Sequence, residues 1–169
     1  LVLSLQRGTL RLTRLIDNLL ESVRIESGQL AIRHQNVAIA EIVEDAVELI
    51  GALLTQRNQR LVLDLPESLP RVDGDGPRLT QVFVNLLANA SKFAPEGSPI
   101  CVGAREREAQ VVIWVEDEGP GVPQIETGSI FERFHRGPDE EPEPGRLGLG
   151  LWLVKSINHR PDRTIAPRP

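Results

Sequence analysis

The tightest constraint on the fold of this chain comes from residues 78–93, which read as one amphipathic helix. Its apolar stripe has helical spacing and consists of Leu79, Val82, Phe83, Leu86, Leu87 and Ala90. Asn85, Asn89 and Lys92 follow at intervals of four and three residues, so they share a second face. Amide oxygens are hard ligands for Mg²⁺, and a lysine ammonium meets phosphate charge. This face predicts a site for a metal ion together with phosphate; a merely solvated polar face is the simpler alternative.

Two glycine-containing turns follow this helix in the sequence. The first is Asp117-Glu118-Gly119-Pro120-Gly121, and the second is Gly148-Leu149-Gly150. Glycine lets a backbone approach a ligand closely. The second turn fits neither a dinucleotide fingerprint nor a P-loop, because Leu153 stands where the former needs glycine and no Gly-Lys-Ser/Thr follows. Each turn alone is a weak signal, since Asp and Gly are common turn residues.

The N-terminal segment, residues 2–26, predicts a long amphipathic helix that ends at Ser27-Gly28. Seven positions, apolar except for Thr9, repeat every seven residues in two interleaved series, Val2, Thr9, Ile16 and Val23 with Leu5, Leu12 and Leu19. Such a seam is typical of a coiled coil or helix bundle. The alternative is a helix packed on its own domain. We expect residues 1–28 to form one helix of a bundle and residues 29–169 to form a separate domain.

The remaining segments alternate between helical and strand patterns, which predicts an α+β fold. Helices are expected over residues 40–57 and 149–157, in addition to residues 78–93. Strands are expected over residues 29–34, 60–65, 100–105 and 110–115. A turn-rich connector is expected over residues 66–77 and a loop over residues 116–146, of which the acidic, proline-rich residues 137–145 suit a mobile lid.

Composition removes several classes of function. The net charge of −5 argues against a nucleic-acid partner, which needs a clustered basic face. No uncharged apolar run approaches the roughly 18 residues that a membrane span needs. The single cysteine, Cys101, allows no internal disulfide and fits a reducing compartment, so a cytoplasmic location is expected.

Four ordered motifs resemble those of the ATP-binding catalytic domain of sensor histidine kinases, within the superfamily that includes gyrase and Hsp90. Residues 78–92, with the pattern Arg-Leu-x-Gln-Val-x-x-Asn-Leu-Leu-x-Asn-Ala-x-Lys, resemble its N box. Asp117-x-Gly119-x-Gly121 resembles the first glycine box, residues 130–136 the F box, and residues 148–151 the second glycine box. The resemblance implies a two-layer α/β sandwich with a mixed sheet, the Bergerat-type ATP-binding fold, preceded by one long bundle helix. It makes residues 1–28 the second helix of a dimerisation or phosphoacceptor-type hairpin and residues 29–169 the ATP-binding catalytic domain.

The resemblance also implies roles for individual residues. Asn89 would coordinate Mg²⁺, with Asn85 assisting directly or through water, and Lys92 would contact the phosphates of ATP. Asp117 would accept a hydrogen bond from the adenine amino group, beside Gly119 and Gly121. The remaining nucleotide contacts would come from Phe131, Gly148, Leu149 and Gly150, the last three at a helix N-terminus that favours anions.

The sequence departs from the family pattern in four places. None of the three histidines, His34, His135 and His159, is followed by a carboxylate, so the family's phosphoacceptor motif is missing from these residues. Phe93 replaces the usual Tyr. Arg146-Leu147 replaces the usual Gly and Thr or Ser of the second glycine box. Residues 158–169 look too short and proline-rich for the two final strands of the family.

We therefore expect the catalytic part of an incomplete or split kinase. It would transfer the γ-phosphoryl group of ATP to a histidine on a separate protein, and a response regulator would act downstream. Residues 2–26 would form a homodimer or heterodimer. The alternatives are a degenerate nucleotide-binding or heterodimerising module without activity, and a piece of a conventional kinase. A gyrase-type ATPase is disfavoured, because the resemblance places a Glu base where Asn85 stands and an amide cannot act as a base.

Overall fold

The computed structural model describes residues 33–108, 110–124, 126–132 and 149–157, and in the N-terminal segment Ile16, Leu19, Leu20, residues 22–25 and Ser27. The chain separates into two compact units. One is Ile32–Gly121, and the other combines Leu1–Ala31 with Val122–Pro169. Each unit is described below by itself. The predicted boundary between residues 28 and 29 stays a prediction.

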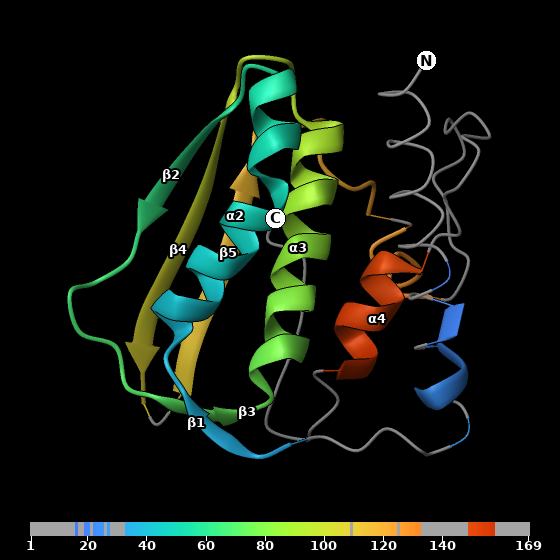
Figure 1. Ribbon diagram of the computed structural model, residues 1–169. Helices are drawn as coiled ribbons and strands as arrows, with labels where there is room; N and C mark the ends of the chain where they lie inside the picture. The colour runs from blue at the N-terminus through green and yellow to red at the C-terminus, as the bar shows by residue number, and fades with distance from the viewer. Residues whose placement is uncertain are drawn as a thin grey trace, which may run out of the picture. The chain divides into compact units, whose positions relative to one another are not determined.

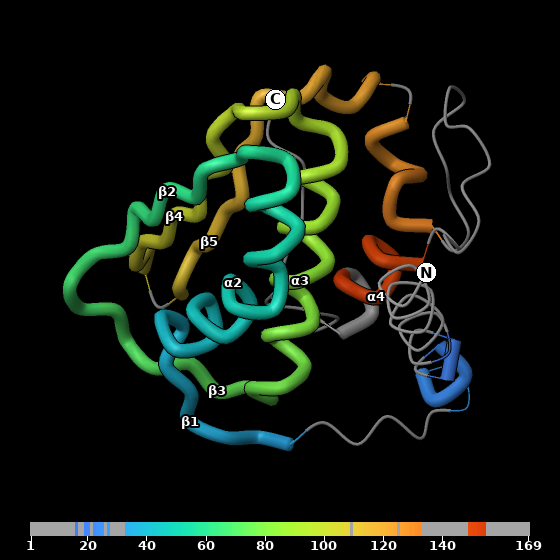
Figure 2. Tube along the Cα trace, turned by 45° about the horizontal axis from the view of Figure 1, so that its top comes forward, coloured from blue at the N-terminus to red at the C-terminus, as the bar shows by residue number. Residues whose placement is uncertain are grey.

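Unit Ile32–Gly121 has two layers, a sheet and a pair of helices that covers one of its faces (Figures 1 and 2). The sheet order is β2-β4-β5, with β2 parallel and β5 antiparallel to β4, so the sheet is mixed. This confirms the predicted α+β fold with a mixed sheet. The elements are α2 (Ile39–Gln56), α3 (Gly76–Phe93), β2 (Arg60–Asp64), β4 (Pro99–Arg107) and β5 (Gln110–Asp117).

The core of this unit lies between the helices and the sheet. Alternate residues of β4, Ile100 and Val102, are fully buried against Val43 of α2 and Leu87 of α3, which are buried to the same extent. Partly buried residues of β5 pack against the same cluster, namely Val111, Ile113 and Val115. The alternation on the strands and the helical spacing on α3 meet at one apolar layer, as the sequence pattern requires.

A second, two-stranded antiparallel pair lies beside this core. It joins β1 (Gln35–Val37) to β3 (Val72–Gly74). Of the strand expected over residues 29–34, residues 29–32 lie outside the described residues, and Arg33 and His34 have no regular structure, so β1 begins after the predicted range. The strand β3 was missed altogether, because three residues inside a proline- and glycine-rich connector leave no periodicity to detect.

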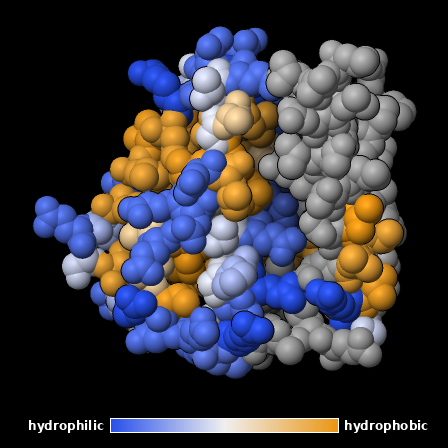
Figure 3. Space-filling model, viewed as in Figure 1, coloured by the Kyte–Doolittle hydropathy of each residue, from blue (hydrophilic) through white to orange (hydrophobic). Residues whose placement is uncertain are grey.

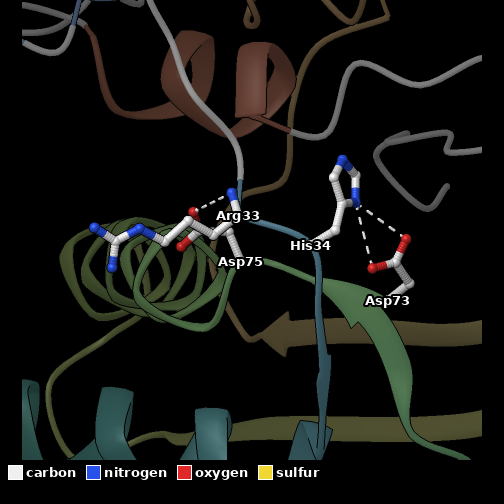
Figure 4. A network of polar contacts seen from close by, with 4 residues as sticks. All are labelled: Arg33, His34, Asp73 and Asp75. Carbon is white, nitrogen blue, oxygen red and sulfur yellow. Dashed lines mark hydrogen bonds and ion pairs between the residues drawn. The ribbon is translucent and has the colours of Figure 1, made fainter.

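Asp75 fixes the start of α3 (Figure 4). Its carboxylate accepts hydrogen bonds from the backbone N–H of Arg78 at 3.3 Å, as an N-cap, and from the backbone N–H of Arg33 at 3.0 Å. Pro77 stands in the first turn, where its missing N–H costs nothing. The helix thus begins at Gly76, two residues before the predicted start, and the segment entering the unit is tied to it. His34 and Asp73 add an exposed contact of 3.1 Å.

The other unit contains part of the predicted N-terminal helix. Its described residues between 16 and 25 are helical, and Ile16, Leu19 and Val23 of the seam are 48%, 44% and 52% exposed. This part of the chain forms an orange patch in Figure 3. The first four seam positions, Val2, Leu5, Thr9 and Leu12, lie outside the described residues.

The same unit contains α4 (Gly150–Ile157), one residue shorter than the predicted helix, and a series of turns in residues 123–132. The expected lid and the tail, residues 137–145 and 158–169, lie outside the described residues, as do His135, His159 and Arg146-Leu147. Within the ranges that are described, no helix is long and apolar enough to cross a membrane.

Candidate functional site

The polar face of α3 forms the first part of the candidate site. Asn85, Asn89 and Lys92 are all half-buried, on the helix whose other side buries Phe83 and Leu87 in the core. The predicted helix is therefore present, and the three residues share one of its faces. The Lys92 ammonium lies 4.2 Å from the centre of the Phe93 ring, a favourable cation–π distance.

The turn after β5 forms the second part. Asp117 is the last residue of β5, and one of its carboxylate oxygens, Oδ1, accepts a hydrogen bond of 2.7 Å from the backbone N–H of Gly119. Asp commonly bonds the backbone two residues on in this way. Gly121 has a φ of 74°, in the left-handed region that favours glycine. The first glycine motif therefore forms an ordered turn. Its Asp117 carboxylate keeps lone pairs that can accept further hydrogen bonds.

The structure brings these two parts together at the end of α3. A β-carbon at Gly119 would lie 3.0 Å from the backbone carbonyl oxygen of Phe93 and 2.6 Å from the Asp117 carboxylate. Only glycine allows this approach without displacement of a neighbour. The residue beside Lys92 in the sequence thus contacts the turn that begins at Asp117, which sequence spacing alone did not reveal.

The charges around this face suit an anionic ligand only in part. Arg78, in the first turn of α3, has its pKa lowered by burial, and a guanidinium remains charged in proteins. Among the described residues, no three His, Cys, Asp or Glu side chains gather as a metal site. A divalent cation at this face would therefore depend on the Asn85 and Asn89 amides and on the oxygens of its ligand. The two amides fit such a role, since a hard cation accepts neutral oxygen donors.

The other predicted site residues belong to the other unit. Leu149 is 2% exposed, and its carbonyl accepts the first helical hydrogen bond of α4, from the Leu153 N–H at 2.8 Å. Gly150 is the first residue of that helix, so both residues stand at a helix N-terminus as predicted. Phe131 is half-buried in a turn. Gly148 lies outside the described residues.

Sequence analysis missed a buried polar pair, Gln59 and Ser91, that holds the last turn of α3. Ser91 is completely buried and Gln59 is 7% exposed. A glutamine between a helix and a strand looks like an ordinary loop residue, and a serine in an apolar stripe is a weak clue. Ser91 lies four residues after Leu87, on the apolar side of the helix, and this spacing is the sequence signal that could have drawn attention to it.

Comparison with known proteins decides the family. Residues 74–166 match the family described as histidine kinase-, DNA gyrase B- and HSP90-like ATPase, which is more than half of the chain. The chain belongs to this family. The matched region begins at β3 and takes in α3, the Asp117 turn and α4. These residues are an ATP-binding catalytic domain of the histidine kinase type.

Relatives of this ATPase domain are sensor kinases. The chain is 34% identical to the sensor protein KdpD of Escherichia coli over 153 residues, 90% of this chain and 17% of KdpD. It is 35% identical to the adaptive-response sensory kinase SasA of Synechocystis over 145 residues, 85% of this chain and 38% of SasA. The chain thus spans less than two fifths of the length of these relatives.

Solved structures agree with the fold of the ATPase domain. The structure of full-length ShkA with AMPPNP matches with a TM-score of 0.76 at 25% identity, covering 93% of this chain and 32% of ShkA. The histidine kinase ThkA, in complex with the response regulator TrrA, matches with a TM-score of 0.69 at 21% identity, covering 90% of this chain and 41% of ThkA. The second likeness shows the fold alone.

Proposed function

We propose that this chain is the catalytic part of a sensor histidine kinase, which binds ATP with Mg²⁺ and transfers the γ-phosphoryl group to a histidine on a separate protein. The observation that supports it most is the contact of Phe93 with Gly119. It places the end of the Asn- and Lys-bearing helix against the turn that begins at Asp117. A nucleotide needs a base site and a phosphate site within one molecular length, and this contact offers both.

On the phosphate side, Asn89 would hold Mg²⁺, with Asn85 assisting directly or through water, and Lys92 would contact a phosphate oxygen. When bound, Mg²⁺ supplies charge neutralisation for the phosphates. Phosphoryl transfer consists mainly of positioning and such neutralisation. The half-buried setting of the three side chains on α3 supports these roles, because partial burial strengthens an ionic contact.

On the base side, Asp117 would accept a hydrogen bond from the adenine amino group, with Gly119 and Gly121 giving the base close access to the backbone. Phe131 and the backbone of Gly148, Leu149 and Gly150 would complete the nucleotide contacts. Backbone N–H groups at a helix N-terminus favour phosphate. That ShkA was crystallised with AMPPNP, an ATP analogue, supports ATP as the ligand of this domain.

None of the three histidines in these residues is followed by a carboxylate, so the phosphoacceptor histidine is placed outside them. We propose that a separate protein carries it. A bundle-forming protein with such a histidine would pair with the exposed seam that includes Ile16, Leu19 and Val23. A response regulator would then receive the phosphoryl group, in keeping with the complex of ThkA with TrrA. Because ATP is the phosphoryl donor, we place the reaction in the cytoplasm.

Nucleotide binding is tested by titrating the chain with a fluorescent ATP analogue, with and without Mg²⁺. Asn89→Ala should weaken binding about ten- to hundredfold only when Mg²⁺ is present, since one lost contact to a charged group is worth about 1.5–3 kcal/mol. Asp117→Asn should weaken binding in both conditions. Asp64→Asn is the matched control, because Asp64 also ends a strand of the same sheet and is exposed. Unchanged affinity in both site variants would remove the assignment.

Phosphotransfer is tested with labelled ATP, Mg²⁺ and candidate histidine-bundle proteins. Label that is acid-labile and alkali-stable on the bundle protein, absent with Lys92→Ala, supports the kinase. Binding of ATP without transfer to any candidate favours the degenerate regulatory module. Label on the isolated chain would contradict action on a separate protein, and His34, His135 and His159 would be substituted in turn to find the acceptor.

A further inference from the structure

Gln59 contacts the last turn of α3. It immediately precedes β2, whereas the Asp117 turn follows β5, and these two strands flank β4 on opposite sides. This residue lies between α2 and β2, and its backbone N–H donates to the Leu54 carbonyl at 3.0 Å, which anchors it on α2. The preceding Asn58 has a φ of 51°, so a tight turn aims the Gln59 side chain. The buried amide is therefore positioned by the backbone on its own side.

The Gln59 side chain both donates hydrogen bonds to the end of α3 and accepts one from it. Its side-chain NH₂ donates to the carbonyl of Ser91 at 3.0 Å and to that of Pro95 at 3.1 Å, with a longer contact of 3.4 Å to Ala94. Its carbonyl oxygen accepts from the Ser91 hydroxyl at 2.6 Å. The last carbonyls of a helix lack partners within the helix. Gln59 satisfies the carbonyl of Ser91, which is inside the helix, in a buried place where an unmet polar group is costly. The carbonyls of Ala94 and Pro95 follow the helix and also accept from Arg57 and Ser98.

Neighbouring bonds add to the same connection. The Arg57 guanidinium donates to the Ala94 carbonyl at 3.1 Å, and the Gly97 N–H donates to the Arg57 carbonyl at 2.9 Å. The chain after α3 is thereby fastened to the chain after α2. Of these contacts, only those of Gln59 reach inside the helix, at Ser91.

Ser91 stands between Asn89 and Lys92 in the sequence but on another side of the helix. At about 100° per residue, its side chain points roughly 120° away from the polar face. Gln59 therefore contacts no group that would touch a nucleotide. It can act on the site only through the backbone that carries Lys92 and the Phe93 carbonyl, which lies against Gly119.

We propose that Gln59 and Ser91 are positioning residues of the nucleotide site, a proposal that rests on the proposed function. They fix the distance between the phosphate-binding end of α3 and the base-binding turn at Asp117. The last turn of α3 is held between Gln59 on one side and Gly119 on the other. Without Gln59, the Ser91 carbonyl loses its buried donor, whereas the carbonyls of Ala94 and Pro95 keep bonds from Arg57 and Ser98. The last turn of α3 then shifts, and Lys92 moves with it.

The experiment compares two ligands in the full chain, ADP with Mg²⁺ and adenosine, both measured by competition with a fluorescent ATP analogue. Gln59→Met keeps the length of the side chain and removes all its hydrogen bonds. Ser91→Ala removes one bond and is the milder variant. Ile50→Val is the control, because Ile50 is 3% exposed in α2 and its loss of a methyl group lowers stability away from the end of α3.

Gln59→Met should weaken ADP binding about five- to tenfold, a change equivalent to about 1–1.4 kcal/mol. Adenosine binding should change less than twofold, because the base site at Asp117 keeps its own turn. Ser91→Ala should weaken ADP binding more than adenosine binding in the same way, but by a smaller factor. If Gln59→Met does not fold, the Ser91→Ala result tests the proposal instead. Ile50→Val should leave both ligands unchanged.

Three results overturn the proposal. Equal weakening of ADP and adenosine means that Gln59 only supports the fold. Unchanged affinities in folded Gln59→Met mean that the end of α3 does not need it, and the proposed function stands. A wild-type chain that binds neither ligand refutes the proposed function, and the positioning role with it.

Discussion

The indole of Trp114 occupies the space beside Gly103: a β-carbon at Gly103 would lie 2.1 Å from an atom of the indole ring. The two residues pair directly across β4 and β5. The Arg105 guanidinium lies 5.7 Å from the same ring, a loose cation–π contact. Because Val102 and Ala104 are buried on the helix side, this group belongs to the opposite face of the sheet.

Gly103→Ala is predicted to lower the free energy of unfolding by about 1–3 kcal/mol, the usual cost of overpacking. Urea denaturation measures it. Gly51→Ala is the control, since no atom lies within 4 Å of a β-carbon there and alanine favours a helix. Adding Trp114→Leu to Gly103→Ala should recover part of the loss. Equal stability of the two alanine variants would show that the indole moves aside freely.

Asp75→Ala is predicted to destabilise the chain by about 1–2 kcal/mol, as loss of a helix N-cap does. The Arg33 and Arg78 N–H groups lose their acceptor at the same time. Asp73→Ala is the control, because its contact with His34 joins side chains that are 50% and 58% exposed and exposed pairs contribute little. A larger effect of the Asp73 variant in urea denaturation would contradict the assignment.

Cys101 is predicted to react slowly with iodoacetamide at pH 8. Partial burial, followed by the charges of Asp64 and Glu116, raises the pKa of its thiol, so less of the reactive thiolate forms. The rate should rise steeply at more alkaline pH, and Asp64→Asn with Glu116→Gln should increase it at pH 8. Since the folded chain holds this proton more tightly than the unfolded one, stability falls as pH rises through the raised pKa. A rate equal to that of the urea-unfolded chain would refute the shift.

Ile16→Asp is predicted to abolish phosphotransfer to the partner protein while nucleotide affinity stays unchanged. Ile16 is 48% exposed, so a charge there removes an apolar contact for a bundle partner without an unpaired charge in the core. Leu12→Asp is expected to act in the same way. Leu49→Asp is the control, because Leu49 is 58% exposed on α2. Normal labelling of the partner by the Ile16 variant would place recognition on the ATPase domain instead.

Elements with long periodic patterns were predictable from the sequence. The helix predicted over residues 40–57 appears as α2, Ile39–Gln56, and the strand predicted over residues 60–65 appears as β2, Arg60–Asp64. The short strands β1 and β3 were not predicted correctly. They exist because Gln35–Val37 and Val72–Gly74 pair with each other across a long stretch of chain, and no local pattern encodes such pairing.

The part of the candidate site that lies on one helix was predictable from the sequence, and the contacts between elements were not. Helical spacing put Asn85, Asn89 and Lys92 on one face, and they do share a face of α3. The approach of Phe93 to Gly119 and the bonds between Gln59 and Ser91 depend on how α2, α3 and β5 pack. Residues that act through backbone contacts leave no mark on composition or spacing, so only the structure reveals them.

The division of α3 into two faces affects how this protein can change during evolution. Leu79, Phe83 and Leu87 hold the core, whereas Asn85, Asn89 and Lys92 lie on a different side of the same helix. One substitution on the polar side can therefore remove a proposed nucleotide contact and leave the apolar core of the unit unchanged. A gene copy with such a substitution would lose nucleotide binding and still encode a folded protein.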